Sequence, residues 1–222
     1  KSIGADSRIG PNFLRAGPGF GGSCFKKDIL NLIYLCDFFN LPEVSNYWES
    51  VLQINNWQRE RISKIVVEKL FGTLNEKKIA ILGFAFKANT NDTRESAAIT
   101  ICKDLLEEGA NLNIHDPKVK FDQIQYELDK CHSKNGYKTE GSWRFSNCID
   151  DVIRDAHAII ILTEWLEYAN IKWEDKEYLL QKPAWIFDTR SIINIDEITK
   201  TKIKLWRLGN FAEKFKNSNN HL

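Results

Sequence analysis

The chain has 222 residues, of which 43% are hydrophobic, so it is long enough to bury a sizeable core in one large or two small domains. A net charge of +1 gives no basic excess that would favour nucleic acid or an anionic membrane as the main partner. No apolar run approaches the ~20 residues of a membrane span, and five irregularly spaced cysteines indicate free thiols in a reducing compartment, the cytoplasm.

The first 22 residues are rich in Gly, Pro, Asn and Ser and predict a loop, after which an apolar-periodic helix is expected over residues 23–39. Cys24 falls in the first turn of that helix, facing unpaired backbone N–H groups and the positive end of the helix dipole. Lys26 and Lys27 lie beside it. Such surroundings lower the pKa of a thiol, so Cys24 is a candidate nucleophile, with a buried structural cysteine as the alternative.

Asp28 lies four residues after Cys24, so the two side chains share one face of the predicted helix. A carboxylate there could orient a water or act as a base, and a solvated acid favoured by the helix dipole is the alternative. The preceding Gly17-x-Gly19-x-x-Gly22 formally matches a dinucleotide-binding fingerprint. We reject that interpretation because no strand is predicted before it, and expect the glycines to let the backbone approach a ligand.

A second helix is predicted over residues 42–71, ending at Gly72. It has no internal Gly or Pro and would be about 40 Å long. A helix of that length must pack along its length, and we expect it to form a homodimer with a second copy of the chain. The apolar residues expected in this contact are Tyr47, Trp48, Val51, Ile62 and Val66.

The rest of the chain alternates strands with helices, which predicts an α/β fold with a doubly wound parallel sheet. A capping-box pattern starts one helix at Asp92, and it is expected to end at Gly109. Residues 118–141 are expected to be an insertion. The predicted strands are 78–82, 111–115, 143–146, 157–162, 184–188 and 203–207, and the other predicted helices are 148–155 and 174–181.

Ligands of such sheets bind at the carboxyl ends of the strands, where Lys87, Asp116 and Arg190 are expected. Lys87 and Arg94 flank a loop before a helix and could hold an anion, with ordinary solvated charges as the alternative. Asp116 takes the position of a ribose-binding acid, but residues 83–87 are not a glycine-rich phosphate loop. The four histidines show no metal-ligand or triad spacing, so no metal site is predicted.

Several motifs resemble the UDP-glucose/GDP-mannose dehydrogenase family. They are Gly-Phe-Gly-Gly-Ser-Cys-Phe-Lys-Lys-Asp at 19–28, Phe-Ala-Phe-Lys-Ala-Asn-Thr-Asn-Asp-Thr-Arg-Glu-Ser at 84–96, Asp-Pro-Lys-Val at 116–119, Thr-Glu-Trp at 163–165 and Phe-Asp-Thr-Arg at 187–190. The resemblance runs from about residue 8 to residue 207, and is closer to members that act on UDP-glucose than to those for GDP-mannose or UDP-N-acetylmannosamine. It implies an N-terminal Rossmann domain for NAD, a central helical region that dimerises, and a C-terminal Rossmann-like domain for a UDP-sugar.

The chain begins at Lys1 and contains no methionine, so we expect it to be a fragment that holds the last two of these parts. Residues 1–74 would be the central helical region with the cysteine loop, 75–210 the UDP-sugar-binding domain and 211–222 a tail. NAD would then be bound mainly by the missing N-terminal domain. The fragment by itself is not expected to catalyse the reaction.

The resemblance implies oxidation of the C6 alcohol of UDP-glucose to the carboxylate of UDP-glucuronate, using two NAD in turn. Cys24 would hold the intermediate aldehyde as a thiohemiacetal and then as a thioester, while Asp28 manages water and protons. The alternatives are a nucleotide-sugar-binding or dimerisation module without turnover, and a dehydrogenase for a related sugar nucleotide. The implied substrate-binding residues are Arg8, which reaches a neighbouring subunit's site, and Phe13, Leu14, Arg15, Gly21, Phe86, Lys87 and Arg190; Lys27 and Arg94 are implied near the cofactor.

Overall fold

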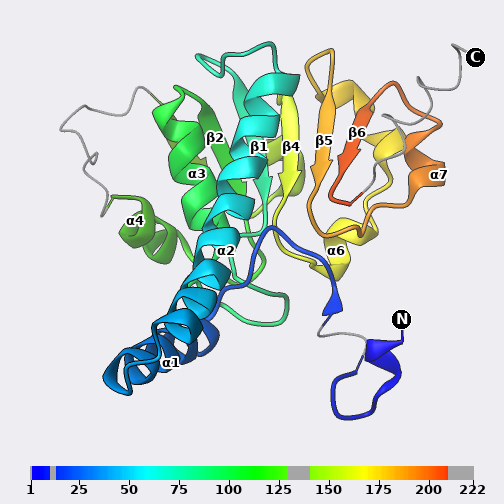
Figure 1. The fold of residues 1–222 in the computed structure, drawn as a ribbon. Helices are drawn as coiled ribbons and strands as arrows, with labels where there is room; N and C mark the ends of the chain where they lie inside the picture. The colour runs from blue at the N-terminus through cyan, green and yellow to red at the C-terminus, as the bar shows by residue number, and fades with distance from the viewer. Residues whose placement is uncertain (1, 11–13, 130–140, 210–222) are drawn as a thin grey trace, which may run out of the picture.

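The computed structural model describes residues 2–10, 14–129 and 141–209 of the chain (Figure 1). A short 3-10 turn, η1 (Ile3–Ala5), precedes the loop that leads into α1 (Phe25–Phe38). Helix α2 (Pro42–Lys69) follows after a short link and packs against α1 as a hairpin that projects beyond the sheet (Figure 1). Pro42 occupies the first turn of α2, where its missing N–H costs no hydrogen bond.

Six parallel strands form one sheet in the order β3-β2-β1-β4-β5-β6, which confirms the predicted fold class. The chain builds outward from β1 to β3 and then returns to build β4, β5 and β6 on the other side. The loops that follow β1 and β4 therefore diverge and leave a crevice at this switch point. The strands are β1 (Lys78–Leu82), β2 (Asn111–His115), β3 (Ser142–Phe145), β4 (Ala158–Ile161), β5 (Trp185–Asp188) and β6 (Lys204–Arg207).

The helices of the sheet domain are α3 (Ala97–Glu107), α4 (Phe121–Asp129), α5 (Ile149–Ile153), α6 (Leu166–Ala169) and α7 (Ile195–Ile198). Two predictions are wrong here. Residues 118–141 contain α4, whose Ile124 and Leu128 are buried, so this stretch is not simply an insertion. The helix predicted over 174–181 consists of two 3-10 turns, η3 (Trp173–Asp175) and η4 (Glu177–Leu179). Helices α6 and α7 have four residues each, too few to show a helical period in sequence.

The capping box predicted at Asp92 is also wrong, because α3 begins five residues later. Ser96 is the N-cap, and its Oγ accepts the Ala98 N–H at 3.3 Å. Asp92 instead accepts the backbone N–H and the guanidinium of Arg94. Glu95 has a φ of 54°, which no helix accommodates, so the chain turns sharply before α3.

The second half of α2 lies on the sheet, which corrects part of the predicted dimer face. Ile62 and Val66 are fully buried in the same core as the strands, so they cannot contact a second copy. The division predicted between residues 74 and 75 stays a prediction, since α2 contributes to the core of the sheet domain. The predicted tail, 211–222, lies outside the described residues. Among the helices in the described ranges, none has the length and apolar character that crossing a membrane requires.

The half-buried carboxyl of Asp104, between α2 and α3, gives a pH-dependent prediction. Ser63 donates a hydrogen bond to Asp104 at 2.8 Å, but burial is the larger effect and raises the pKa of Asp104 above its ordinary 3.8. The folded state therefore holds this proton more tightly, and stability is lost as the pH rises from 3.8 through the raised pKa. Asp104→Asn keeps an acceptor for Ser63 without the charge. Its free energy of unfolding, measured with urea, should therefore fall less between about pH 4 and pH 7 than that of the unchanged chain. Asp37→Asn, an exposed change, is the control, and equal pH slopes for Asp104→Asn and the unchanged chain would contradict the prediction.

Candidate functional site

A cavity of about 670 Å³ lies where the glycine loop crosses the carboxyl ends of the strands. Figure 1 shows this blue loop passing beneath the sheet between α2 and α6. The walls come from four places: the loop between Arg15 and Gly21, Phe25 at the start of α1, one face of α2, and the loops after β1, β4 and β5. The cavity therefore occupies the switch point, where this topology leaves room for a ligand. The residues from α2 and the sheet end are Val51, Ile54, Asn55, Gln58, Phe86, Lys87, Glu164 and Arg190.

The glycines allow the loop to lie directly on the sheet end. A Cβ at Gly21 would stand 2.3 Å from the backbone oxygen of Glu95, and a Cβ at Gly17 would stand 2.7 Å from Nη1 of Arg190. A side chain at position 21 would require the backbone to move, and one at position 17 would require the Arg190 side chain to shift. The glycines thus let the loop lie against the protein's own sheet end, and their approach to a ligand stays a prediction. No strand precedes the loop among the described residues.

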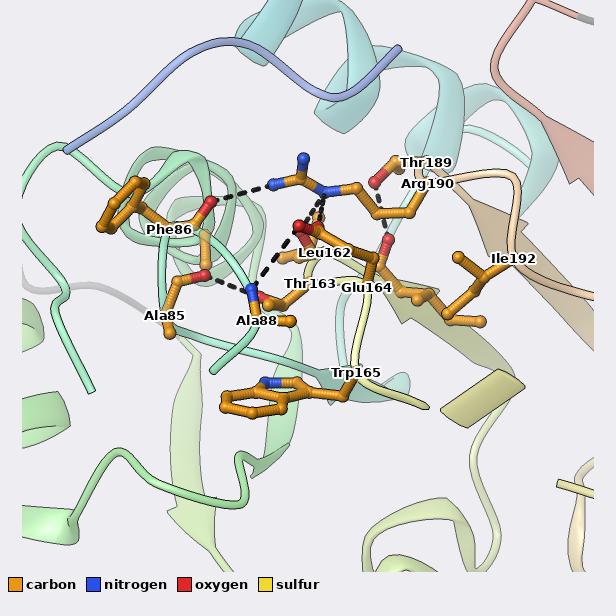
Figure 2. A network of polar contacts seen from close by, with 12 residues as sticks. Ala85, Phe86, Ala88, Leu162, Thr163, Glu164, Trp165, Thr189, Arg190 and Ile192 are labelled. Carbon is orange, nitrogen blue, oxygen red and sulfur yellow. Dashed lines mark hydrogen bonds and ion pairs between the residues drawn. The ribbon is translucent and has the colours of Figure 1, made fainter. Parts of the chain in front are cut away.

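Arg190 joins three loops at the floor of the cavity (Figure 2). Its Nε donates to the carbonyl of Leu162 at 2.7 Å, and its Nη2 donates to the carbonyl of Phe86 at 3.1 Å. Oε2 of Glu164 lies 3.2 Å from Nε of Arg190, so a carboxylate balances part of the charge. Burial lowers the pKa of Arg190, and the charge of Glu164 opposes that shift. Arg190 therefore organises the site as well as lining it.

Asp116 does not face the cavity, which separates this sheet from a dinucleotide-binding one. Its Oδ2 accepts the N–H groups of Phe84 and Ala85 at 2.7 and 3.0 Å and the indole N–H of Trp165 at 3.2 Å. Its Oδ1 accepts the N–H groups of Lys118 and Val119, both at 2.9 Å. With five donors from the protein and 2% exposure, this carboxylate has no capacity left for a ribose.

Cys24 lies at the start of α1, beside the cavity rather than in its wall. It is the N-cap residue of α1 and is exposed, with Sγ 3.6 Å from Oγ of Ser23. Gly21, three residues before it, and Phe25, directly after it, line the cavity. The thiol thus stands at a helix start, where the first N–H groups have no partner within the helix, at the edge of a ligand-sized space.

Charged groups surround this thiol. Asp92 holds the Arg94 guanidinium through two side-chain hydrogen bonds of 2.9 and 2.8 Å. These bonds are the main cause that raises the pKa of Arg94. Lys26 pairs with Glu95 at 2.9 Å, while Lys27 and Asp28 are exposed on the first turn of α1.

The structure brings five of the predicted substrate-binding residues to one cavity, and it leaves others apart. Arg8 pairs with its neighbour Asp6 at 2.6 Å, and its side chain is 87% exposed on the N-terminal turn. Leu14 is exposed and Phe13 lies outside the described residues. Metal-holding groups of His, Cys, Asp and Glu do not occur in the described part of the chain. The five residues that share the cavity are Arg15, Gly21, Phe86, Lys87 and Arg190.

Sequence reasoning missed the contribution of α2 and of Glu164. Val51, Ile54, Asn55 and Gln58 stand three, four and seven residues apart, so they share one helical face. The polar residues Asn55 and Gln58 interrupt this otherwise apolar face, and this pattern in the sequence could have indicated that the face is not simply a subunit contact. Val51, predicted in the dimer face, lines the cavity instead.

Two profiles of one protein family match the chain. The UDP binding domain of the UDP-glucose/GDP-mannose dehydrogenase family matches residues 80–195, and the central domain of that family matches residues 1–57. The UDP binding domain match contains Lys87, Glu164 and Arg190. The central domain match contains the glycine loop and Cys24, so both sides of the cavity are covered.

Individual relatives agree with these profiles. The UDP-glucose 6-dehydrogenase of Drosophila melanogaster is 45% identical over 94% of this chain, and that of Caenorhabditis elegans is 44% identical over 94%. The matches cover 44% and 43% of those relatives, so the chain spans less than half of their length. The solved UDP-glucose dehydrogenase of Pyrobaculum islandicum superposes with a TM-score of 0.71 at 27% identity, covering 93% of this chain and 41% of that one.

Proposed function

The chain belongs to the UDP-glucose/GDP-mannose dehydrogenase family, and from this premise we propose that it is the UDP-sugar-binding and thiol-bearing part of an NAD-dependent enzyme that oxidises UDP-glucose to UDP-glucuronate. The observation that carries the proposal is the 670 Å³ cavity between the glycine loop and the sheet end, with Cys24 at its edge. The four described cysteines are free thiols, which supports a reducing compartment such as the cytoplasm.

The cavity suits a nucleotide-sugar in size and charge. Arg15, Lys87 and Arg190 supply cations, and Glu164 is the one acid among the described residues of its wall, so the net charge of this lining favours a diphosphate. The aromatic rings of Phe20 and Phe25, 4.8 Å apart, add flat apolar surface. Because the cations lie at the sheet end and Cys24 lies at the loop, we propose that the diphosphate binds near Lys87 and the sugar extends toward the thiol.

The described residues do not fit NAD. Residues 83–87 after β1 are not a glycine-rich phosphate loop, and Asp116 is saturated with donors from the protein. We therefore propose no dinucleotide site in this sheet, and expect NAD to be held chiefly by another part of the parent protein. Lys27 and Arg94, exposed near Cys24, remain predicted contacts of that cofactor.

The thiol supplies the covalent step. Once the C6 alcohol has become an aldehyde, Sγ of Cys24 attacks the carbonyl carbon, a C–S bond forms and the oxygen takes a proton. NAD, held by another part of the parent protein, would supply the oxidising power for the alcohol and for the Cys24 adduct. Water then attacks the thioester carbon, the C–S bond breaks, and the thiolate leaves as the carboxylate forms. Asp28, one turn along α1, is proposed to orient this water or take its proton.

Binding of UDP-glucose to the 222-residue chain tests the substrate assignment. Lys87→Met removes an exposed cation at the cavity, so calorimetry should show binding weakened about tenfold or more. Lys120→Met, an exposed change outside the cavity, should leave the affinity unchanged. We expect no NADH from this chain with UDP-glucose and NAD. Equal affinity in both variants, or sustained NADH production, would count against the proposal.

We also propose that the chain forms a homodimer through the α1–α2 hairpin. The hairpin of α1 and α2 extends away from the sheet (Figure 1). Several apolar side chains on and beside the link between its two helices are exposed. A second copy could cover this surface by using the same face twice, as two-fold symmetry requires. These side chains are Phe38, Phe39, Leu41, Val44 and Tyr47, exposed by 71%, 66%, 47%, 43% and 63%.

Light scattering at tens of micromolar protein should report a dimer for the unchanged chain. Tyr47→Glu places a charge in the proposed contact and should shift the population to monomer. Tyr178→Glu changes an aromatic residue that is 78% exposed on η4, and should leave the dimer intact. A monomer for the unchanged chain, or a dimer in the Tyr47→Glu variant, would argue against this interface.

A further inference from the structure

Two buried polar side chains of helix α2 form hydrogen bonds with the backbone of the glycine loop. Oδ1 of Asn55 accepts the N–H of Phe20 at 2.8 Å, and Nδ2 of Asn55 donates to the carbonyl of Phe20 at 3.2 Å. One turn further along α2, Nη2 of Arg59 donates to the same carbonyl at 2.6 Å. Both groups of the Phe20 backbone are therefore bound by one helix, although this loop has no regular structure of its own.

Arg59 also holds a second loop. Nη2 of Arg59 donates to the backbone carbonyl of Glu95 at 2.9 Å, and Nη1 lies 3.8 Å from the Glu95 carboxylate. Arg59 is only 6% exposed, and its Nε has no hydrogen-bond partner within the described residues. Burying a guanidinium in this way is costly, and burial lowers the pKa of Arg59 against the opposing charge of Glu95. An apolar residue would pack there at less cost, so the value of Arg59 lies in the hydrogen bonds that its guanidinium donates.

The two loops that Arg59 joins enclose the start of α1. The N–H of Gly22 donates to the carbonyl of Arg94 at 2.9 Å, directly before Cys24. Lys26, two residues after Cys24, pairs with the Glu95 carboxylate at 2.9 Å. The chain on either side of the thiol is thus attached to residues 94 and 95.

The backbone conformation of Glu95 must be stabilised by contacts with other residues. Its φ of 54° is a left-handed conformation that costs a residue with a side chain of order 1 kcal/mol. Its carbonyl is the atom that approaches the position of Gly21, where no Cβ would fit. The donor from Arg59 stabilises this carbonyl and so maintains the close contact between the two loops.

We propose that Arg59 is a positioning residue for Cys24, fixing the thiol relative to the cavity by binding the Phe20 and Glu95 carbonyls with one guanidinium nitrogen. The proposal deepens the proposed function and rests on it, since the thiol must be the group that reacts. Arg59 does not itself line the cavity, so it makes no direct contact with a ligand bound there. It also connects the cysteine loop to the helix that continues into the proposed dimer contact.

The test uses the full-length protein with Arg59→Lys, which keeps the charge but cannot reproduce the geometry of the guanidinium. The steady-state kcat should fall about tenfold to a hundredfold because the thiol is misplaced. The KM for UDP-glucose should stay within about twofold, since the cavity keeps its cations. Lys64→Ala, an exposed change one turn further along α2, should alter neither constant. Unchanged kcat in Arg59→Lys, or loss confined to KM, would overturn the proposal.

Two further measurements separate positioning from general stability and from the reaction itself. In Arg59→Ala, added methylguanidinium should restore part of the lost kcat, which a merely destabilised fold would not show. Hydrogen exchange on the unchanged protein should find the Phe20 and Gly22 amides protected, and fast exchange at both would overturn the proposal even if no variant folds. A Cys24→Ser variant measured in parallel distinguishes the failures. Full turnover there refutes the thiol chemistry, whereas the exchange result reports on whether the loop that Arg59 binds is held in place through the bonds of the Phe20 and Gly22 amides to Asn55 and Arg94.

Discussion

Replacing Cys24 with serine in the full-length protein is expected to lower turnover by roughly three orders of magnitude or more. A serine hydroxyl keeps the shape of the side chain but is a poor nucleophile without a neighbouring base. UDP-glucose should bind with unchanged affinity, because Cys24 stands beside the cavity and not in its wall. Steady-state NADH production measures the turnover, and mass spectrometry of the quenched protein shows whether an adduct has accumulated.

Cys148→Ser is a matched control within the same chain. Cys148 is also exposed and is also an N-cap residue, at the start of α5, but it lies outside the cavity lining. Its replacement should leave kcat and KM unchanged, so a helix start alone does not explain the effect at Cys24. If Cys24→Ser turned over like the unchanged enzyme, the thiol would be structural and the proposed role of Asp28 would lose its basis.

Replacing Asp116 with asparagine is expected to lower the free energy of unfolding by about 3 to 5 kcal/mol. Its two carboxylate oxygens accept five N–H donors, three on Oδ2 and two on Oδ1. Asparagine offers one oxygen, so its NH₂ group must face one set of buried donors and leave them unpaired. For a chain of this size the change corresponds to a drop in Tm of about 10 °C. Thermal and urea unfolding of the 222-residue chain provide the measurement.

Asp151→Asn makes the same chemical change at an exposed position and should shift the Tm by no more than about 2 °C. The loop after β1 should also loosen in Asp116→Asn, since the bonds to Phe84 and Ala85 shape it. UDP-glucose binding is therefore expected to weaken together with stability. Equal Tm values for the two variants would show that Asp116 does not hold this end of the sheet.

The short-range features of this protein could be predicted from sequence alone. Buried strands such as Ala158–Ile161 are continuous apolar runs bounded by turns, and their alternation with helices indicates a parallel sheet without further information. The start of α1 after a glycine loop places Cys24 at a helix N-terminus, and the observed start of the helix agrees with the prediction to within two residues. These features depend on neighbours along the chain, which the sequence displays directly.

Contacts between distant residues were decided by the tertiary structure. The stripe that includes Ile62 and Val66 has the same helical period whether it meets a partner or its own sheet, and only the folded chain shows that it is buried internally. The position of Asp116 in the sequence is that of a ribose-binding acid, and only the hydrogen-bond donors that surround it in the structure exclude this role.

The same limit explains the site. Asn55 and Arg59 lie 31 and 35 residues from Cys24, and nothing local to α2 marks them as bound to the Phe20 backbone. Local sequence determines which segments are strands and helices, because propensity and period act over a few residues. The cavity and its support depend on which segments the sheet order brings together, and that order is settled by packing of the whole chain.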